Sequence, residues 1–338
     1  IGVPRNFVVF DEGDQQALVK EALSALNIDS QQFRPADVLV AISRLKNELV
    51  TPEQMRRTRK GPFEEVVRRV YTRYQAGLAD NRALDFDDLI LKAVELFEKC
   101  PDVLERWQER LRYILVDEYQ DINYAQYRLV HLLAGKYRNI CVVGDDDQSI
   151  YGWRGANVGL ILRFHEDYPE ARVFRLEQNY RSTKRILECA NAVISHNRMR
   201  AHKRLWTENP QGKPAVVYEA VDDEDEASWV VEVIRRGLAR GRRPGDFAVL
   251  YRVNAMSRRF EEHLMRAGIP YQIVGGTRFY ERAEIKDVVA YLRLLHNPDD
   301  SVSARRVIGR PPRGIGELSL IHISEPTRPR LISYAVFC

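Results

Sequence analysis

Two adjacent carboxylates, Asp117 and Glu118, directly follow the apolar run Tyr113–Val116. The run has the composition of a buried strand, and α/β proteins bind ligands at the carboxyl ends of such strands. There, Asp117 could hold a Mg²⁺ ion while Glu118 orients and deprotonates the water that attacks a phosphate. Because acidic residues after a strand often only cap the next helix, the neighbouring segments must decide between the two interpretations.

A second polar loop, residues 144–156, follows the apolar run Ile140–Val143. It contains three consecutive aspartates, which are costly to bring together unless something binds there. Gln148 can donate to a phosphate oxygen, and Tyr151 and Trp153 offer flat faces on which unpaired bases can stack. The alternative for these two aromatic residues is that they fill the core at a turn.

A third polar segment, residues 177–183, follows the apolar run Val173–Leu176. Arg181 could make a bidentate contact to a phosphate and spread the charge of a transition state, and Tyr180 could stack on a purine ring. Taken alone, this segment would be an ordinary helix cap.

The elements that must position these loops differ along the chain. Residues 1–84 show helical spacing over Asp14–Leu26, Asp37–Leu49 and Pro62–Leu78, which predicts a mostly helical unit. Its basic loop is either a solvated charge run or a contact to a DNA backbone. The residues of that loop are Arg56, Arg57, Arg59 and Lys60.

From residue 84 onward, helical patterns alternate with short β-branched runs, which is typical of parallel sheets with crossover helices. The sequence therefore predicts two α/β units in series. The predicted strands are Tyr113–Val116, Ile140–Val143, Val173–Leu176, Ala215–Glu219, Phe247–Tyr251 and Tyr271–Val274, and the later helices are predicted at 224–240, through 265, and at 284–295.

Composition limits the class of protein but not its function. The 338 residues are 45% hydrophobic and 30% charged, which predicts two to three globular domains. With no apolar run of about 18 residues, no basic-then-apolar leader and four scattered cysteines, we expect a cytoplasmic protein without a membrane partner. A net charge of +4 is too small to indicate nucleic-acid binding, so the motifs must carry that argument.

Together, the three polar segments resemble motifs II, III and IV of the superfamily 1A helicases of the UvrD/PcrA/Rep type. The stretches at 84–89, 247–258 and 275–287 also agree, in the same order. The resemblance implies RecA-like P-loop NTPase motor domains with a helical insertion. It assigns residues 1–84 to insertion 1B, 85–175 to motor domain 1A, 176–296 to the first half of 2A and 297–317 to the start of insertion 2B.

The resemblance also implies a role for each candidate residue. Asp117 would hold Mg²⁺, Glu118 would activate water, Gln148 and Arg181 would contact the γ-phosphate of ATP, and Tyr180 would stack on adenine. Single-stranded DNA would lie against Tyr151 and Trp153, with further contacts from Arg252 and Asn254. Such helicases step 3′ to 5′ on single strands and at junctions with duplex DNA, and they have partner proteins in DNA repair or replication.

Two features depart from the family pattern. No GxxxxGK[ST] loop occurs, so the lysine that contacts the β- and γ-phosphates is absent, and the chain stops before motifs V and VI. We interpret the chain as an internal fragment that would not hydrolyse ATP by itself. A non-hydrolysing DNA-binding module and the helicase part of a helicase–nuclease are the alternatives. Residues 318–338 resemble a translated sequencing adapter and are excluded from the predicted fold.

Overall fold

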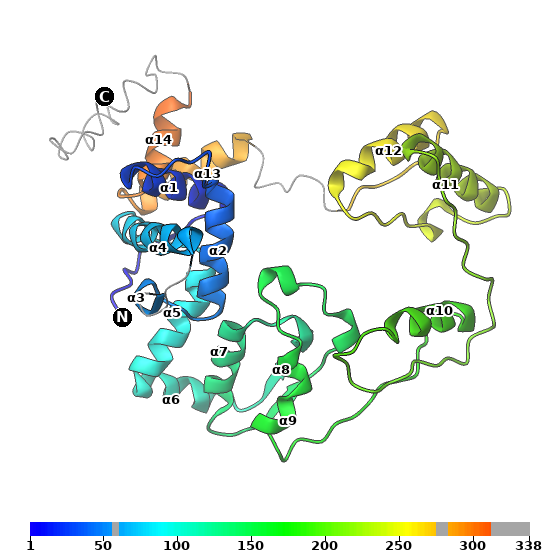
Figure 1. The fold of residues 1–338 in the computed structure, drawn as a ribbon, viewed down its shortest axis with the longest axis horizontal. Coiled ribbons are helices and arrows are strands. Elements are labelled where there is room, and N and C mark those ends of the chain that lie inside the picture. Colours follow the sequence, from blue (N-terminus) through cyan, green and yellow to red (C-terminus); the bar gives the residue numbers. More distant parts are fainter. Residues whose placement is uncertain (56–60, 275–282, 312–338) are drawn as a thin grey trace. The chain divides into compact units, whose positions relative to one another are not determined.

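A computed structural model describes residues 1–55, 61–274 and 283–311. The chain divides into two compact units. Unit 1 comprises 1–177, 194–204 and the chain from 283 onward, and unit 2 comprises 178–193 and 205–282 (Figure 1). The basic loop 56–60, most of the motif at 275–287 and the segment 318–338 lie outside the described residues. The predicted bounds of the four domains remain predictions.

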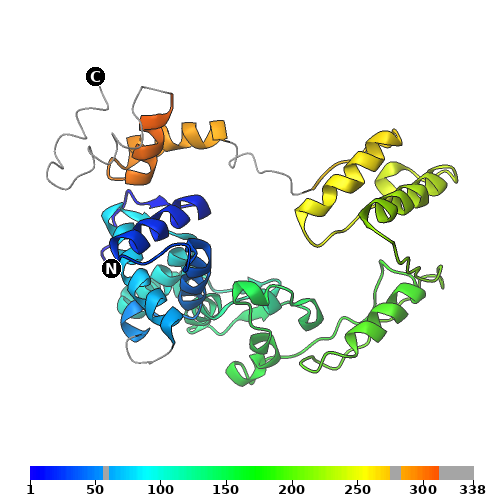
Figure 2. The same ribbon diagram turned by 45° about the horizontal axis from the view of Figure 1, so that its top comes forward.

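The N-terminal part of unit 1 is helical, as its spacing predicts (Figure 2). An Asp11–Asp14 capping box starts the first helix, and prolines at the first turn start the second and fourth. Their apolar faces bury Val19, Ile42 and Tyr74 in one core with the short parallel pair β1–β2. The elements are β1 (Val8–Val9), α1 (Glu12–Ala25), α2 (Pro35–Asn47), α3 (Pro52–Met55), α4 (Pro62–Asp80) and β2 (Ala83–Leu84).

The next part of unit 1 carries the first two polar loops on a parallel pair of strands, β3 and β4. Ile114, Leu115 and Val116 are in register with Ile140, Cys141 and Val142, which confirms the two predicted strands. The elements are α5 (Phe86–Lys99), α6 (Pro101–Arg110), β3 (Ile114–Val116), the 3₁₀ turn η1 (Tyr119–Asp121), α7 (Tyr124–Ala134), β4 (Ile140–Val142), the turns η2 (Asp146–Gln148) and η3 (Gly152–Arg154), α8 (Gly159–Leu162) and α9 (Phe164–Asp167).

Helices α13 (Ala283–His296) and α14 (Ser301–Gly309) pack together within unit 1. Lys286 pairs with Asp11 at 2.8 Å and Arg293 with Asp14 at 2.5 Å, so two basic residues of α13 meet the acidic start of α1. The amide of Asn297 donates to the Asn81 carbonyl at 2.7 Å. These contacts attach α13 and α14 to the N-terminal helices.

The described part of unit 2 contains the helices α10 (Lys184–Ile194, of which 184–193 belong to unit 2), α11 (Asp223–Leu238) and α12 (Ser257–Arg266), with the turns η4 (Pro244–Asp246) and η5 (Asn254–Met256). Val231, Ile234 and Leu264 form its main core together with Ile269. A single bridge joins Gln178 to Trp206. The helices predicted at 224–240 and through 265 are confirmed.

The other four predicted strands are wrong: among the residues that the structure describes, none of these segments pairs as a strand. Phe174, Val217 and Leu250 are 80%, 93% and 95% exposed. A parallel strand needs a hydrogen-bonding neighbour and a cover for both faces. Among the described residues these runs have no strand neighbour, although Phe247 and Val249 pack against the core of unit 2. The described residues contain no helix long and apolar enough to cross a membrane.

Candidate functional site

The first two polar loops meet at the carboxyl edge of the β3–β4 pair. The Val143 amide donates to the Val116 carbonyl at 2.8 Å, and the Tyr119 amide donates back to the Val143 carbonyl at 3.0 Å. The ladder therefore continues past the strand ends and holds the two loops side by side. The arrangement agrees with the rule that the carboxyl ends of parallel strands lie at one edge of a sheet, where ligands bind.

Glu118 occupies an uncommon backbone conformation at this edge. Its φ of 51° and ψ of 41° lie in the left-handed region, which costs free energy for a residue with a side chain. The Asp117 carboxylate accepts a hydrogen bond from the Glu118 backbone amide at 2.9 Å, and both residues are exposed. The chain thus turns sharply after β3 and presents two carboxylates in succession at the surface.

Gln120 connects this carboxylate pair to the second loop. It is only 1% exposed, and its amide nitrogen donates to Glu118 Oε2 at 2.7 Å. Its amide oxygen accepts a hydrogen bond from the backbone amide of Asp145 at 3.0 Å. Its backbone carbonyl accepts a hydrogen bond from the Ser149 hydroxyl at 3.2 Å. The Gln120 side chain therefore orients Glu118 and holds the start of the turn that carries Gln148, and the Gln120 backbone holds its end.

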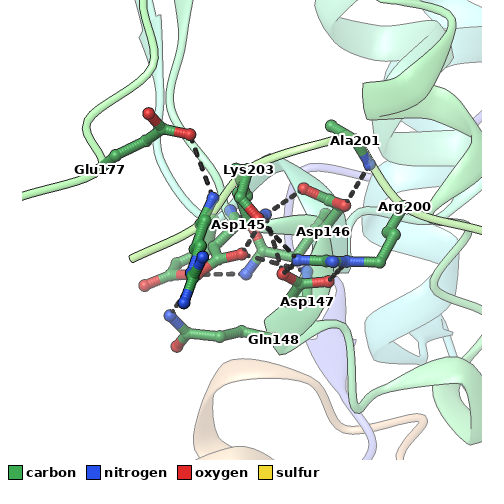
Figure 3. Close-up of polar contacts among 11 residues, drawn as sticks. Asp145, Asp146, Asp147, Gln148, Glu177, Arg200, Ala201 and Lys203 are labelled. Carbon is green, nitrogen blue, oxygen red and sulfur yellow. Dashed lines mark hydrogen bonds and ion pairs between the residues drawn. The ribbon is translucent and has the colours of Figure 1, made fainter. Parts of the chain in front are cut away.

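The turn itself is held by charged contacts, shown in Figure 3. The Gln148 amide donates to Asp145 at 2.8 Å. Arg200 makes two parallel bonds to Asp147 at 2.8 and 2.7 Å, and Lys203 lies 2.5 Å from Asp145 and also contacts Asp146. Burial alone would raise the pKa of Asp145, but Lys203 and Gln148 outweigh it and hold that pKa below its usual value.

Beyond the turn, Tyr151 and Trp153 present aromatic faces to solvent. Trp153 is 68% exposed and Tyr151 40%, with ring centroids 6.4 Å apart. The guanidinium of Arg154 lies 4.6 Å from the Trp153 ring and 5.5 Å from the Tyr151 ring. Neither aromatic side chain fills a core, so the alternative interpretation of core packing is wrong for both.

The remaining predicted site residues lie in unit 2. The side-chain oxygen of Asn179 accepts hydrogen bonds from the backbone amides of Arg181 and Ser182 at 3.0 and 2.7 Å. These bonds start the turn before α10. The Tyr180 side chain is 78% exposed, and its hydroxyl donates to Gln178 at 2.9 Å. Arg181 is exposed, as are Arg252 and Asn254 at the start of η5.

Asp117 is the candidate metal ligand at this sheet edge. The described residues contain no cluster of three or more acidic, histidine or cysteine side chains that could enclose a metal. Mg²⁺ is usually held by one or two carboxylates together with phosphate oxygens and water, and the exposed Asp117 carboxylate fits that pattern.

No individual role was predicted for Gln120, Arg154, Arg200 or Lys203. Gln120 could have been suspected, because it follows the carboxylate pair by two residues. Arg200 and Lys203 could not be paired with the aspartates from sequence, since more than 50 positions separate them.

The fold and the loops at the strand ends can now be set beside known proteins. Residues 1–169 match the UvrD/REP helicase N-terminal domain, and residues 174–334 match the UvrD-like helicase C-terminal domain. The chain belongs to the UvrD/REP helicase family, and the resemblance drawn from the motifs is confirmed. The second match runs to residue 334 and therefore includes most of 318–338, where a departure from the family was predicted. That departure remains a prediction.

The chain is similar to enzymes named ATP-dependent DNA helicase PcrA. It is 51% identical over 320 residues to the protein of Staphylococcus epidermidis and 50% identical over the same length to that of Staphylococcus aureus. Each alignment covers 95% of this chain and 44% of the relative. The chain thus spans less than half the length of the curated relatives it matches.

Proposed function

We propose that this chain is part of an ATP-dependent helicase or translocase that moves 3′ to 5′ along single-stranded DNA and acts at its junctions with duplex DNA. Unit 1 would contribute Asp117 as the magnesium ligand, Glu118 as the base and Gln148 as the contact to the γ-phosphate. The proposal also gives Tyr180 a stacking contact to the base of ATP and Arg181 a contact to its phosphates. In this proposal the parallel pair β3–β4 of unit 1 is part of a RecA-like motor domain.

The observation that carries the proposal is the Gln120 bridge between Glu118 and the 145–148 turn. A base must be held in a fixed direction to deprotonate one water, and the bond from Gln120 supplies that direction. The same bridge holds the turn that ends in Gln148 and is followed by Tyr151 and Trp153. Binding of nucleotide and binding of single-stranded DNA would therefore act on one connected set of hydrogen bonds.

Bound Mg²⁺ would neutralise charge that develops on the phosphates. Asp117 would hold it, because its carboxylate is exposed beside Glu118. Arg181 would stabilise charge on the transferred phosphoryl group through its planar guanidinium.

We also propose that the chain by itself does not turn over ATP, because no GxxxxGK[ST] loop is present to cradle the phosphates. The lysine of that loop would come from a longer protein that contains this sequence. A non-hydrolysing DNA-binding module is the competing function, and the same missing loop is what favours it.

The test compares DNA binding by the chain with turnover by the longer protein. We expect the chain to bind a fluorescein-labelled oligothymidine, with affinity that falls as salt rises, and to release no phosphate from ATP. In the longer protein, Glu118→Gln should keep nucleotide binding and abolish DNA-stimulated phosphate release. Glu105→Gln, a matched change of an exposed glutamate on α6, should leave turnover unchanged. Absence of turnover in the unaltered longer protein would favour the non-hydrolysing module.

A further inference from the structure

Residues 194–204 supply the counter-charges for the three aspartates of the 145–147 turn. This segment belongs to unit 1, whereas the residues that flank it in the chain belong to unit 2. The Ala201 amide donates to Asp146 at 2.7 Å, and the Arg204 amide donates to Glu177 at 3.1 Å. Backbone and side-chain contacts thus fix the segment against the turn along several residues.

Partial burial makes these contacts stronger than surface ion pairs. The side chains of Asp146 and Asp147 are 7% and 13% exposed, and those of Arg200 and Lys203 are 15% and 16% exposed. The bidentate geometry of Arg200 on Asp147 adds direction to the attraction. Among the described residues, two cations contact the three carboxylates of the turn.

The clamped turn lies between the two predicted binding functions. Asp145 accepts from Lys203 and from Gln148, and its own amide donates to Gln120, which bonds to Glu118. On its C-terminal side, the turn leads within three residues to Tyr151 and within five to Trp153. A shift of the turn would therefore move both Gln148 and the aromatic face.

We propose that Arg200 and Lys203 are positioning residues that clamp the 145–148 turn and so set the geometry of Gln148 and of the Tyr151–Trp153 face for single-stranded DNA. The part of the inference that concerns DNA rests on the proposed function. The clamp itself can be measured without DNA. Neither residue touches nucleotide or DNA in this proposal, because both act through the aspartates.

Positioning and simple electrostatics predict opposite effects for one substitution. Asp147→Asn removes a negative charge near the aromatic face, which by charge alone would strengthen binding to a polyanion. If the clamp positions the face, the same substitution weakens binding, because the bidentate ion pair with Arg200 is lost. Asp147→Asn is therefore more informative than Arg200→Gln, which both explanations predict to be harmful.

The experiment is a double-mutant cycle on the whole chain with two readouts. The variants are Asp147→Asn, Arg200→Gln and the two combined, and the control is Glu105→Gln, which removes a negative charge from the exposed pair with Lys136. Hydrogen exchange of the peptide 145–156 reports the clamp, and exchange of α4 reports the overall fold. Anisotropy of labelled oligothymidine reports DNA affinity.

We expect hydrogen exchange to become faster in 145–156 and to stay unchanged in α4. Affinity for oligothymidine should be about tenfold weaker in either single variant, because a loss of that size corresponds to one charge-assisted hydrogen bond. The combined variant should be no weaker than either single one. Unchanged or tighter binding by Asp147→Asn, or additive losses in the combined variant, would overturn the inference. If the unaltered chain binds no DNA while exchange responds as expected, the proposed function fails and the clamp stands.

Discussion

The Lys46 ammonium lies 2.5 Å from the Asp85 carboxylate, and both side chains are almost fully shielded from water. Asp88 is equally buried and lies 2.9 Å from the same ammonium. The Tyr74 hydroxyl donates to Asp85 at 2.9 Å, and Lys46 also faces the Tyr74 ring at 5.1 Å. This buried cluster joins α2 and α4 to the start of α5, the helix that leads toward β3.

Removing the cation should destabilise the chain far more than removing an exposed one. Lys46→Met would leave two buried carboxylates without a counter-charge, and we expect the free energy of unfolding in urea to fall by about 3–5 kcal/mol. Arg44→Met on the same helix breaks only the exposed pair with Glu48 and should cost at most about 1 kcal/mol. Equal losses in the two variants would show that the cluster does not hold these helices together.

Asp88 is expected to respond to pH in an unusual direction. Burial raises its pKa above the usual value, and the opposing attraction of Lys46 does not cancel that effect. Gln75 donates to Asp88 at 3.4 Å, while the oxygen of the same amide, Oε1, is buried and has no hydrogen-bond partner among the described residues. A rotated Gln75 amide would turn its oxygen toward Asp88, where it would accept a hydrogen bond whenever the carboxyl group is protonated.

The sign of the pH effect follows from the raised pKa. The folded state binds the Asp88 proton more tightly than the unfolded state, so its contribution to stability falls as pH rises from 3.8 through the folded pKa. Asp88→Asn removes this titration, and its stability relative to the unaltered chain should rise over that window. Asp145→Asn should show the opposite slope, because the pKa of Asp145 is lowered. Urea unfolding at a series of pH values measures both, and parallel slopes would contradict this assignment.

The helices could be predicted because their signals are local. The capping boxes at Asp11–Asp14 and Asp85–Asp88 and the prolines at the first turns mark starts that need no distant partner. Strands β3 and β4 were also predictable, since they satisfy each other's hydrogen bonds across a short loop and helix. From that pairing, the meeting of Glu118 with the 145–148 turn follows.

What the sequence could not supply is pairing over distance. Val173–Leu176 has the composition of a strand, but a strand exists only where a neighbour accepts its hydrogen bonds. Likewise, the sequence alone suggests that Lys46 is a surface residue of α2 and that Arg200 belongs to an exposed basic stretch. Only the structure places Lys46 beside Asp85 and Arg200 beside Asp147. Charge pattern alone cannot say which basic residue neutralises which acid.

A side chain at Gly144 is predicted to displace Gln120. A Cβ there would lie 2.5 Å from the Gln120 amide oxygen and 2.8 Å from Ile161. Gly144→Ala should therefore displace Gln120 and lower the free energy of unfolding by about 1–3 kcal/mol. Gly152→Ala is the control, because a Cβ at that position meets nothing within 4 Å. A Gly144→Ala variant as stable as Gly152→Ala would show that the Gln120 bridge adapts freely.

Trp153 should carry a measurable share of the affinity for single-stranded DNA. Its ring is 68% exposed next to Tyr151, and loss of one base-stacking contact usually costs about 1–3 kcal/mol. Trp107→Ala is a matched control: Trp107 on α6 is also exposed and also lies under an arginine, Arg110, at 5.4 Å. Trp153→Ala should weaken binding of labelled oligothymidine while Trp107→Ala does not. Trp153→Phe should recover part of the loss, because a smaller ring still stacks. Equal affinities in the two alanine variants would remove Trp153 from the path of the strand.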